Sequence, residues 1–267
     1  MSSAAIVLAG GRSVRMGEPK ALLDWHGSTL ARRAVGLVAR AVDGPVVVVR
    51  AAGQALPALP PATELAHDAA EARGPLQGMA AGFAAIGERA EIVFVTGVDA
   101  PLLHPALIAH VLASLRAGDD VALPQAHGFP HPLAAAYRAT TVAPLIDDLL
   151  AEDSLGTTPL MGRCRVRRLD KAALLADPAV AALDPELRSL DNLNEPAEYA
   201  AARARPEPLV TVQGRGALRA ATLARAGGGP GASINGRPAD DPQEPLAAGD
   251  VVRLTGAPDG DARDLSR

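Results

Sequence analysis

Glycines and cationic side chains gather in the first loop of the chain, at residues 8–20, whose sequence is Leu-Ala-Gly-Gly-Arg-Ser-Val-Arg-Met-Gly-Glu-Pro-Lys. Gly10 and Gly11 carry no Cβ, so the backbone can approach a ligand and its N–H groups can converge on an anion. Arg15 and Lys20 add positive charge that suits phosphate oxygens. The loop lacks the endings of a Walker A loop and of the dinucleotide fingerprint. These residue types predict a binding site for the phosphates of a nucleotide.

A second candidate group spans residues 68–78, where Asp68 precedes the segment Gly74-Pro75-Leu76-Gln77-Gly78. Pro75 suits the first turn of a helix, and the N-terminus of a helix favours negative charge. The two glycines permit close approach of a ligand. The carboxylate of Asp68 could accept hydrogen bonds from N–H groups of a ligand. A helix cap with an exposed aspartate is the structural alternative.

Asp99 is the third candidate, because it follows an aliphatic segment, residues 91–96, that has the pattern of a buried strand. Ligands of open α/β sheets bind just beyond the carboxyl ends of the strands. Mg²⁺ prefers hard oxygen ligands and keeps several waters, so one or two carboxylates suffice to hold it. Asp99 is therefore a candidate ligand of Mg²⁺.

Alternating aliphatic strands and helices must position these groups. We expect strands at residues 4–8, 45–50, 91–96, 119–124 and 133–137, and helices at residues 29–41, 75–87, 104–117 and 143–151, with Ser28 as the first N-cap. The strand–helix–strand order predicts right-handed crossovers and a parallel sheet. The predicted fold class is α/β, with a mostly parallel, Rossmann-like sheet flanked by helices. The proline-rich residues 127–132 are expected to form an irregular loop.

A further strand is expected at residues 163–169, with Arg163, Arg165 and Arg167 on one face. Such a row could attract a phosphorylated acceptor, or it could be a solvated sheet edge. Cys164 is interpreted as a small apolar residue of this strand.

Composition excludes several classes of function. The 267 residues carry a net charge of −4, which argues against nucleic acid as a partner. One cysteine allows no internal disulfide and fits a reducing compartment. No apolar segment reaches the ~20 residues that span a bilayer, and no signal peptide is recognisable. We expect a cytoplasmic protein that does not bind membranes.

The pattern changes after residue 205. A break at residues 203–208 separates an expected domain at 1–205 from a small β-rich appendage at 208–259. Strands are expected at 209–212, 232–238 and 250–254, and a helix at 217–226.

The string from Leu8 to Lys20 resembles the L-A-G-G-x-S-x-R-M-G-x-x-K signature of nucleotidyltransferases of the molybdenum cofactor guanylyltransferase type. In that family the loop wraps the triphosphate of the nucleotide, and an Asp with a G-P-L-x-G segment contacts base and ribose. The resemblance therefore implies nucleotide binding by Leu8, Ala9, Gly10, Gly11, Lys20, Asp68, Gly74, Pro75, Leu76, Gly78 and Asp99.

The resemblance extends to three later segments. Asp99 matches the metal-binding aspartate of the family's D-x-P-L motif. The cluster Asp191-Asn192-Leu193-Asn194-Glu195-Pro196 resembles the family's D/N-x-N-T/E-P-E-E ending, which implies that Asn194, and Asp191 with it, approaches the metal and phosphates. An N-cap role of Asn194 for the helix after Pro196 remains open. A similar His-Pro segment borders the acceptor, which implies that His131 lies near the substrate.

The function implied is transfer of GMP from GTP to molybdopterin with release of pyrophosphate, supported by Mg²⁺. Arg15, Lys20 and Asp99 would be the catalytic residues. The choice of GTP rests on Gly10-Gly11 and Gly74-Pro75-Leu76. The alternatives are a relative that uses CTP or another phosphorylated acceptor, and a non-catalytic nucleotide-binding module that docks on molybdenum cofactor assembly proteins or molybdoenzyme chaperones.

Residues 208–259 resemble the small β-grasp sulfur carriers of the ThiS and MoaD kind, through an Asn-Gly turn and the run Pro-Leu-Ala-Ala-Gly-Asp-Val-Val. Those carriers end in a Gly-Gly tail, whereas this chain ends Asp264-Leu265-Ser266-Arg267. An interaction module therefore fits the appendage better than a working carrier.

Overall fold

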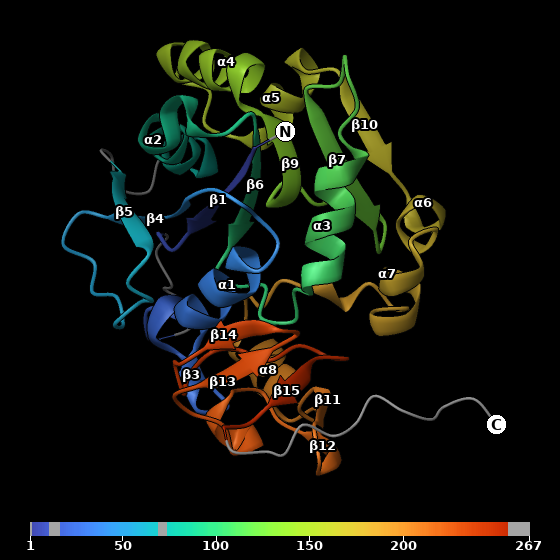
Figure 1. Ribbon diagram of the computed structural model, residues 1–267. Coiled ribbons are helices and arrows are strands. Elements are labelled where there is room, and N and C mark those ends of the chain that lie inside the picture. Colours follow the sequence, from blue (N-terminus) through green and yellow to red (C-terminus); the bar gives the residue numbers. More distant parts are fainter. Residues whose placement is uncertain (1, 11–16, 69–73, 256–267) are drawn as a thin grey trace.

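The computed structural model describes residues 2–10, 17–68 and 74–255 (Figure 1). Its main sheet has the strand order β10-β7-β9-β6-β1-β4-β5, with the short β8 paired to β7. The strands are β1 (Ser3–Leu8), β4 (Val46–Ala51), β5 (Thr63–Asp68), β6 (Ile92–Gly97), β7 (Val121–Ala126), β8 (Phe129–Pro130), β9 (Ala134–Arg138) and β10 (Val166–Leu169). β1, β4, β5 and β6 are parallel, whereas β9 runs antiparallel to β6 and β7. The predicted α/β class with a mostly parallel sheet is confirmed.

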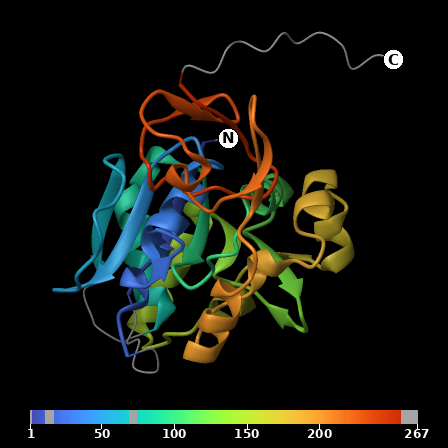
Figure 2. The ribbon, with the colours of Figure 1, turned by 90° about the horizontal axis from the view of Figure 1, so that it is seen from below.

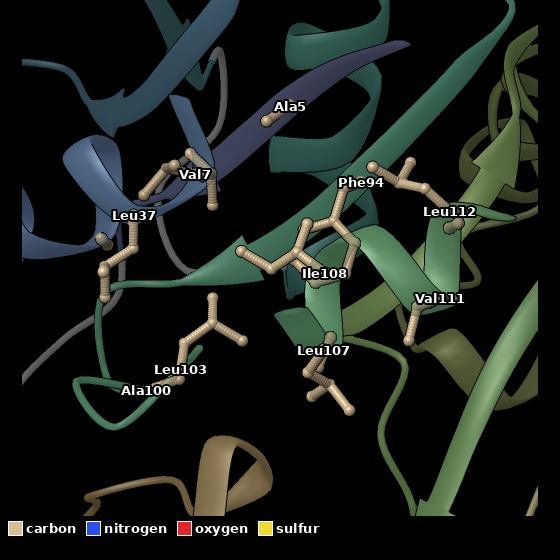
Figure 3. Packing of buried hydrophobic residues seen from close by; sticks show 14 of the residues in the cluster. Ala5, Val7, Leu37, Phe94, Ala100, Leu103, Leu107, Ile108, Val111 and Leu112 are labelled. Carbon is tan, nitrogen blue, oxygen red and sulfur yellow. The ribbon is translucent and has the colours of Figure 1, made fainter. Parts of the chain in front are cut away.

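Helices cover both faces of this sheet, so its central strands are buried on two sides and are continuously aliphatic. On one face lie α1 (Leu30–Ala39) and α3 (Pro105–Ser114), and on the other α2 (Pro75–Ile86) and α4 (Ala139–Ala151). Figure 3 shows the first layer, in which Val7 and Phe94 of the sheet pack with Leu37 of α1 and Ile108 of α3. This three-layer core fixes the strand ends that carry the candidate site.

Local signals explain most helix boundaries, with small corrections. α1 is capped by Thr29 rather than by Ser28, because the Thr29 hydroxyl accepts from the N–H of Arg32 at 3.3 Å. Proline opens α2, α3, α7 (Pro178–Leu183) and α8 (Pro196–Arg203). The remaining short elements are α5 (Thr157–Arg163), α6 (Lys171–Leu175) and the hairpin of β2 (Asp24–Trp25) and β3 (Ser28–Thr29).

The predicted row of three arginines is wrong, because Arg163 belongs to α5 and the strand begins only at Val166. Arg163 pairs with Glu152 at 2.5 Å, and Arg165 pairs with Asp120 at 2.9 Å. Arg163 and Arg165 therefore form ion pairs within the protein and do not form a row that could bind a phosphorylated acceptor substrate. Cys164 is likewise the C-cap of α5 and not a strand residue, and burial raises the pKa of its thiol to about 11.

The chain after α8 forms a second sheet with its own core. Its order is β12-β11-β15-β13-β14, from β11 (Leu209–Val212), β12 (Gly216–Arg219), β13 (Ala232–Ile234), β14 (Arg237–Ala239) and β15 (Val251–Arg253). The expected helix at 217–226 is wrong: Gly214 and Gly216 adopt positive φ and turn the chain back, so the following residues pair with β11. Only Ala224–Ala226 forms a 3₁₀ turn.

This C-terminal sheet packs against α1 (Figures 1 and 2). A Cβ on Gly36 of α1 would lie 2.5 Å from the ring of Pro245. The Pro245 ring of the C-terminal part therefore packs directly against the backbone of α1. Arg40, the C-cap residue of α1, donates to the Asp250 carboxylate at 2.8 Å. Helices of the described residues are all too short or too polar to cross a membrane.

Candidate nucleotide site

A cavity of about 340 Å³ opens at the carboxyl ends of β1 and β6. This is the edge of the sheet at which open α/β folds bind their ligands. It brings together residues that are distant in sequence: Leu8, Ala9, Gly10, Lys20, Asp68, Gly74, Pro75, Gly78 and Asp99 all line it. The cavity therefore gathers the first three groups that the sequence singled out.

Lys20 lines this cavity and lies between two oxygen-bearing side chains. Its ammonium nitrogen is 3.5 Å from Oδ2 of Asp99 and donates to Oδ1 of Asn194 at 2.9 Å. Lys20 belongs to a short 3₁₀ turn, and Asp99 follows β6. The N–H of Leu193 donates to the carbonyl of Asp99 at 2.8 Å, which fixes the segment of Asn194 beside the aspartate. The Lys20 ammonium group, the Asp99 carboxylate and the Asn194 carboxamide oxygen thus converge beside the cavity.

Asn194 does not cap α8 with its side chain. Glu195 is the N-cap and forms a capping box with Glu198, whose carboxylate also accepts from the N–H of Asn194 at 2.7 Å. The carboxamide of Asn194 is therefore left to bond Lys20.

Glycines are required at two positions by close contacts. Gly74 has a φ of 84°, and a Cβ there would lie 2.6 Å from the carbonyl oxygen of Leu155. Gly97, the last residue of β6, is more informative, because a Cβ there would lie 2.4 Å from Oδ1 of Asp99. The Asp99 carboxylate occupies the space that a side chain at residue 97 would need. Gly97 was not singled out from the sequence, although its place two residues before Asp99 was visible.

The backbone after β1 is held from the side. Its N–H groups at Ala9 and Gly10 both donate to the carbonyl of Val49, at 2.8 and 3.3 Å. The Gln54 side chain donates to the carbonyl of Ala9 at 2.8 Å. These bonds fix the start of the glycine loop. Gly11 and Arg15 lie outside the described residues.

Other predicted site residues do not line the cavity. Leu76 is fully buried within the core beneath α2, because its apolar side chain turns away from the helix start towards the sheet. Asp191 faces His127, with 3.7 Å between Oδ1 and Nε2, and burial raises its pKa. The Asp191 carboxylate thus contacts His127, whereas the Asn194 carboxamide bonds Lys20.

His131 is also directed elsewhere. Its Nε2 lies 3.1 Å from the carbonyl oxygen of Ala126, and burial lowers its pKa. The segment expected to be an irregular loop forms the β7–β8 hairpin, which explains this contact. Leu133, just after it, does line the cavity, as do Val49 and Val98. Apolar wall residues of this kind carry no sequence signal that separates them from the core.

Asp99 and Asn194 supply hard oxygen atoms of the type that Mg²⁺ prefers. Across residues 2–10, 17–68 and 74–255, no group of three or more His, Cys, Asp or Glu residues forms a metal cage. Mg²⁺ is usually held by one or two carboxylates together with substrate phosphates, so the pair fits this ion when a nucleotide is bound.

A mostly parallel sheet with a cavity at its carboxyl edge, lined by glycines together with Lys20, Asp68 and Asp99, is the architecture with which open α/β folds bind their ligands. Residues 5–170 match the model of the MobA-like NTP transferase domain. The chain therefore belongs to the MobA-like NTP transferase family.

Relatives and solved structures agree with this family. The chain is 37% identical over 207 residues to a probable molybdenum cofactor guanylyltransferase of Mycobacterium avium, covering 75% of this chain and 95% of the relative. A protein of the same name from Methanosarcina acetivorans is 31% identical over 203 residues, covering 72% and 86%. The molybdopterin-guanine dinucleotide biosynthesis protein A of Archaeoglobus fulgidus shares the fold, with a TM-score of 0.58, 21% identity and coverage of 75% and 96%.

Proposed function

We propose that this enzyme transfers GMP from GTP to the phosphate of molybdopterin and releases pyrophosphate. The observation that carries the proposal is the convergence of Lys20 and Asp99, which line the cavity, with Asn194, which bonds Lys20. The names of the relatives at 31–37% identity support the same reaction.

The cavity suggests how GTP is held. The triphosphate would lie over the N-terminal glycine loop, close to Gly10 and Lys20. Asp68 lines the same cavity and carries the carboxylate that guanine N1–H and the N2 amino group could bond. Gly74 and Gly78 at the start of α2 leave room for the nucleoside.

The reaction needs no covalent enzyme intermediate. An oxygen of the acceptor phosphate attacks the α-phosphorus of GTP and forms the new P–O bond. The bond from that phosphorus to the β-phosphate oxygen breaks, and pyrophosphate leaves with the electron pair. Lys20 would stabilise the charge that develops on the leaving group, and Arg15 is proposed to assist.

Asp99 and Asn194 are the residues that would hold Mg²⁺. When bound, the ion would supply further neutralisation of phosphate charge. The hydrogen bond from Lys20 to Asn194 keeps the carboxamide oxygen beside Asp99 before the ion arrives.

Thermal shift with GTP, CTP, ATP and UTP in the presence of Mg²⁺ tests the nucleotide. A ligand at ~100 times its Kd stabilises by about 2.7 kcal/mol. We expect GTP to raise the Tm. We then expect pyrophosphate to be released when molybdopterin is added to the protein with GTP and Mg²⁺. A shift with CTP would identify a cytidylyl relative, and no shift with any nucleotide would favour a non-catalytic module.

We also propose that residues 208–259 are an interaction module of the β-grasp kind. The strand order supports this proposal, since β11 and β15 pair in parallel at the centre of the sheet. β12, the hairpin partner of β11, and β13, which runs antiparallel to β15, flank this central pair. Molybdenum cofactor assembly proteins or molybdoenzyme chaperones are the partners that we propose for it.

A further inference from the structure

A second cavity, of about 170 Å³, lies where the C-terminal sheet meets the nucleotidyltransferase part of the chain. We call it the junction cavity. Trp25, His26 and Arg33 line it from one part, and Arg205 and Ala247 line it from the linker and the C-terminal part. Among the residues that the structure describes, none lines both this cavity and the nucleotide cavity. The cavity is formed by the contact between the nucleotidyltransferase part and the C-terminal sheet, because both contribute lining residues.

Arg33 of α1 is the buried charge of the junction cavity, with 4% of its surface exposed. Its Nη1 donates to the carbonyl of Leu246 at 3.2 Å, and its Nε donates to the carbonyl of Pro101. Both acceptors are neutral backbone groups. Burial lowers the pKa of Arg33 to about 10, so the side chain stays charged at neutral pH. Burying a cation without an opposite charge in contact is costly.

The nearby carboxylate of Asp250 does not neutralise Arg33 by contact. Arg40 takes that carboxylate in two hydrogen bonds, and the Asn235 side chain and the N–H of Ala247 donate to it as well. Arg40 also repels Arg33, which contributes to the lowered pKa. Arg33 therefore retains charge for a further anionic partner.

Arg205 adds a second positive charge from the linker. Within the described part of the chain, its guanidinium takes part in no hydrogen bond or ion pair, and it is exposed at the junction cavity. The third arginine of the lining, Arg188, is paired with Glu186. Two cations, one buried and one exposed, thus line the cavity without acidic contacts.

The two carboxylates of the lining are already committed. Glu207 accepts from Nε of Arg225 at 2.7 Å and from the N–H of Ala221 at 2.8 Å. Asp184 accepts from the N–H groups of Arg188 and Ser189, at 2.7 and 3.0 Å. The charge left without a direct partner in the junction cavity is therefore positive.

We propose that the junction cavity binds a small oxyanion, namely inorganic phosphate or a compact phosphate monoester, between Arg33 and Arg205. Guanidinium groups match phosphate oxygens through paired N–H donors. The volume lies below the ~300–1,000 Å³ of pockets for larger ligands, which suits a compact anion. Since both parts of the chain supply the walls, the anion would stabilise their junction. This site is separate from GMP transfer and does not depend on it.

The sole tryptophan of the chain reports on this site, because Trp25 lines the junction cavity. We would titrate the full chain with inorganic phosphate and with glycerol phosphate, and follow Trp25 emission and the Tm. A saturable change in emission with a rise in Tm is expected. The probe that saturates at the lower concentration identifies the free ion or the monoester as the preferred source.

Matched variants separate this site from other phosphate binding. Arg205→Gln should raise the Kd for the better probe about tenfold, whereas Arg168→Gln, an exposed arginine on β10, should leave it unchanged. Lys20→Ala should weaken the response to GTP and retain the response of Trp25 to phosphate. Turnover of GTP should persist in Arg205→Gln.

Three results would overturn the proposal. They are no saturable response of Trp25, equal weakening by Arg205→Gln and Arg168→Gln, or loss of the phosphate response in Lys20→Ala alone. The last would place the anion in the nucleotide cavity. Failure of GTP binding would leave the phosphate titration unaffected, so the two proposals fail independently.

Discussion

The ammonium group of Lys20 lies 3.5 Å from the Asp99 carboxylate and 2.9 Å from the Asn194 carboxamide oxygen. This position gives it both a charge partner in the free enzyme and access to arriving phosphates. We expect Lys20→Ala to lower the kcat for pyrophosphate release about 10²–10³-fold, because a preorganised donor to the leaving group is lost. Lys171→Ala, at an exposed lysine of α6, is the matched control and should be neutral. Unchanged turnover in Lys20→Ala would contradict the mechanism.

Gly97 allows a second prediction at the scale of single residues. In Gly97→Ala the new methyl group needs the position of Oδ1 of Asp99, 2.4 Å from the Cβ. Displacement of that carboxylate should lower kcat about 10–100-fold and raise the Mg²⁺ concentration needed for half-maximal activity. Gly162→Ala is the control, because a Cβ at Gly162 meets no atom within 4 Å and its φ is not positive. Gly118→Ala is unsuitable, because the φ of Gly118 is positive. A Gly97→Ala enzyme with the metal requirement of the parent would argue against Asp99 as ligand.

Particular residues show what the sequence could reveal about the site. Lys20, Asp68 and Asp99 were predicted because each belongs to a segment that resembles a motif of the guanylyltransferase family, and all three line the cavity. Gly97 was missed because its role depends on a rotamer of Asp99. Leu76 was predicted to bind the nucleotide only because it belongs to the Gly-Pro-Leu motif, whereas its side chain is buried in the hydrophobic core.

At the scale of elements, an ion pair between Arg165, just before the edge strand β10, and Asp120, just before β7, joins the two strands. Arg165 donates to the Asp120 carboxylate at 2.9 and 3.1 Å, and these bonds lower the pKa of Asp120 to about 2. A carboxylate with a lowered pKa contributes stability that is present above its unfolded pKa, about 3.9, and is lost as the pH falls towards its folded pKa.

Asp120→Asn should therefore destabilise the protein by about 1–2 kcal/mol at pH 7, with the difference from the parent shrinking between about pH 4 and pH 2. Urea unfolding at a series of pH values measures it. Asp147→Asn, at an exposed carboxylate of α4, is the control and should show no such trend. A difference that is independent of pH would mean that the ion pair is not the cause.

Elements differ in how far local sequence determines them. The aliphatic strands β1, β4 and β6 and the proline-led helices α2, α3 and α8 were predicted, because burial on both faces and helix starts leave strong local patterns, whereas the short α7 was not predicted. Residues 217–226 were mistaken for a helix because they are rich in alanine, and only the pairing of β12 with β11 overrides that propensity.

At the scale of the whole molecule, the C-terminal sheet and α1 form one packed unit. Arg33 and Arg40 occupy helix positions that resemble a solvated face in sequence, yet they bond Leu246 and Asp250 across the junction. Neither the docking nor the junction cavity could be predicted, because both depend on residues more than 200 positions apart.

Gly36 offers the sharpest test of this docking. An alanine in a helix interior normally stabilises relative to glycine by up to about 1 kcal/mol. In Gly36→Ala, however, the Cβ would lie 2.5 Å from two ring carbons of Pro245, which must move. We expect a net loss of about 1–3 kcal/mol, measured as a lower Tm and a lower free energy of unfolding. The sign of the change therefore reports whether the C-terminal sheet rests on α1.

The control is Gly162→Ala in α5, where a Cβ meets no atom within 4 Å. That variant should be stabilised by about 0.5 kcal/mol, as helix propensity alone requires. Stabilisation of Gly36→Ala by the same amount would mean that the C-terminal sheet leaves α1 in solution. A lower free energy of unfolding in Gly36→Ala together with a higher one in Gly162→Ala would show that the C-terminal sheet packs on α1. Both variants replace glycine with alanine in a helix, and Pro245 is close to the new Cβ only at residue 36.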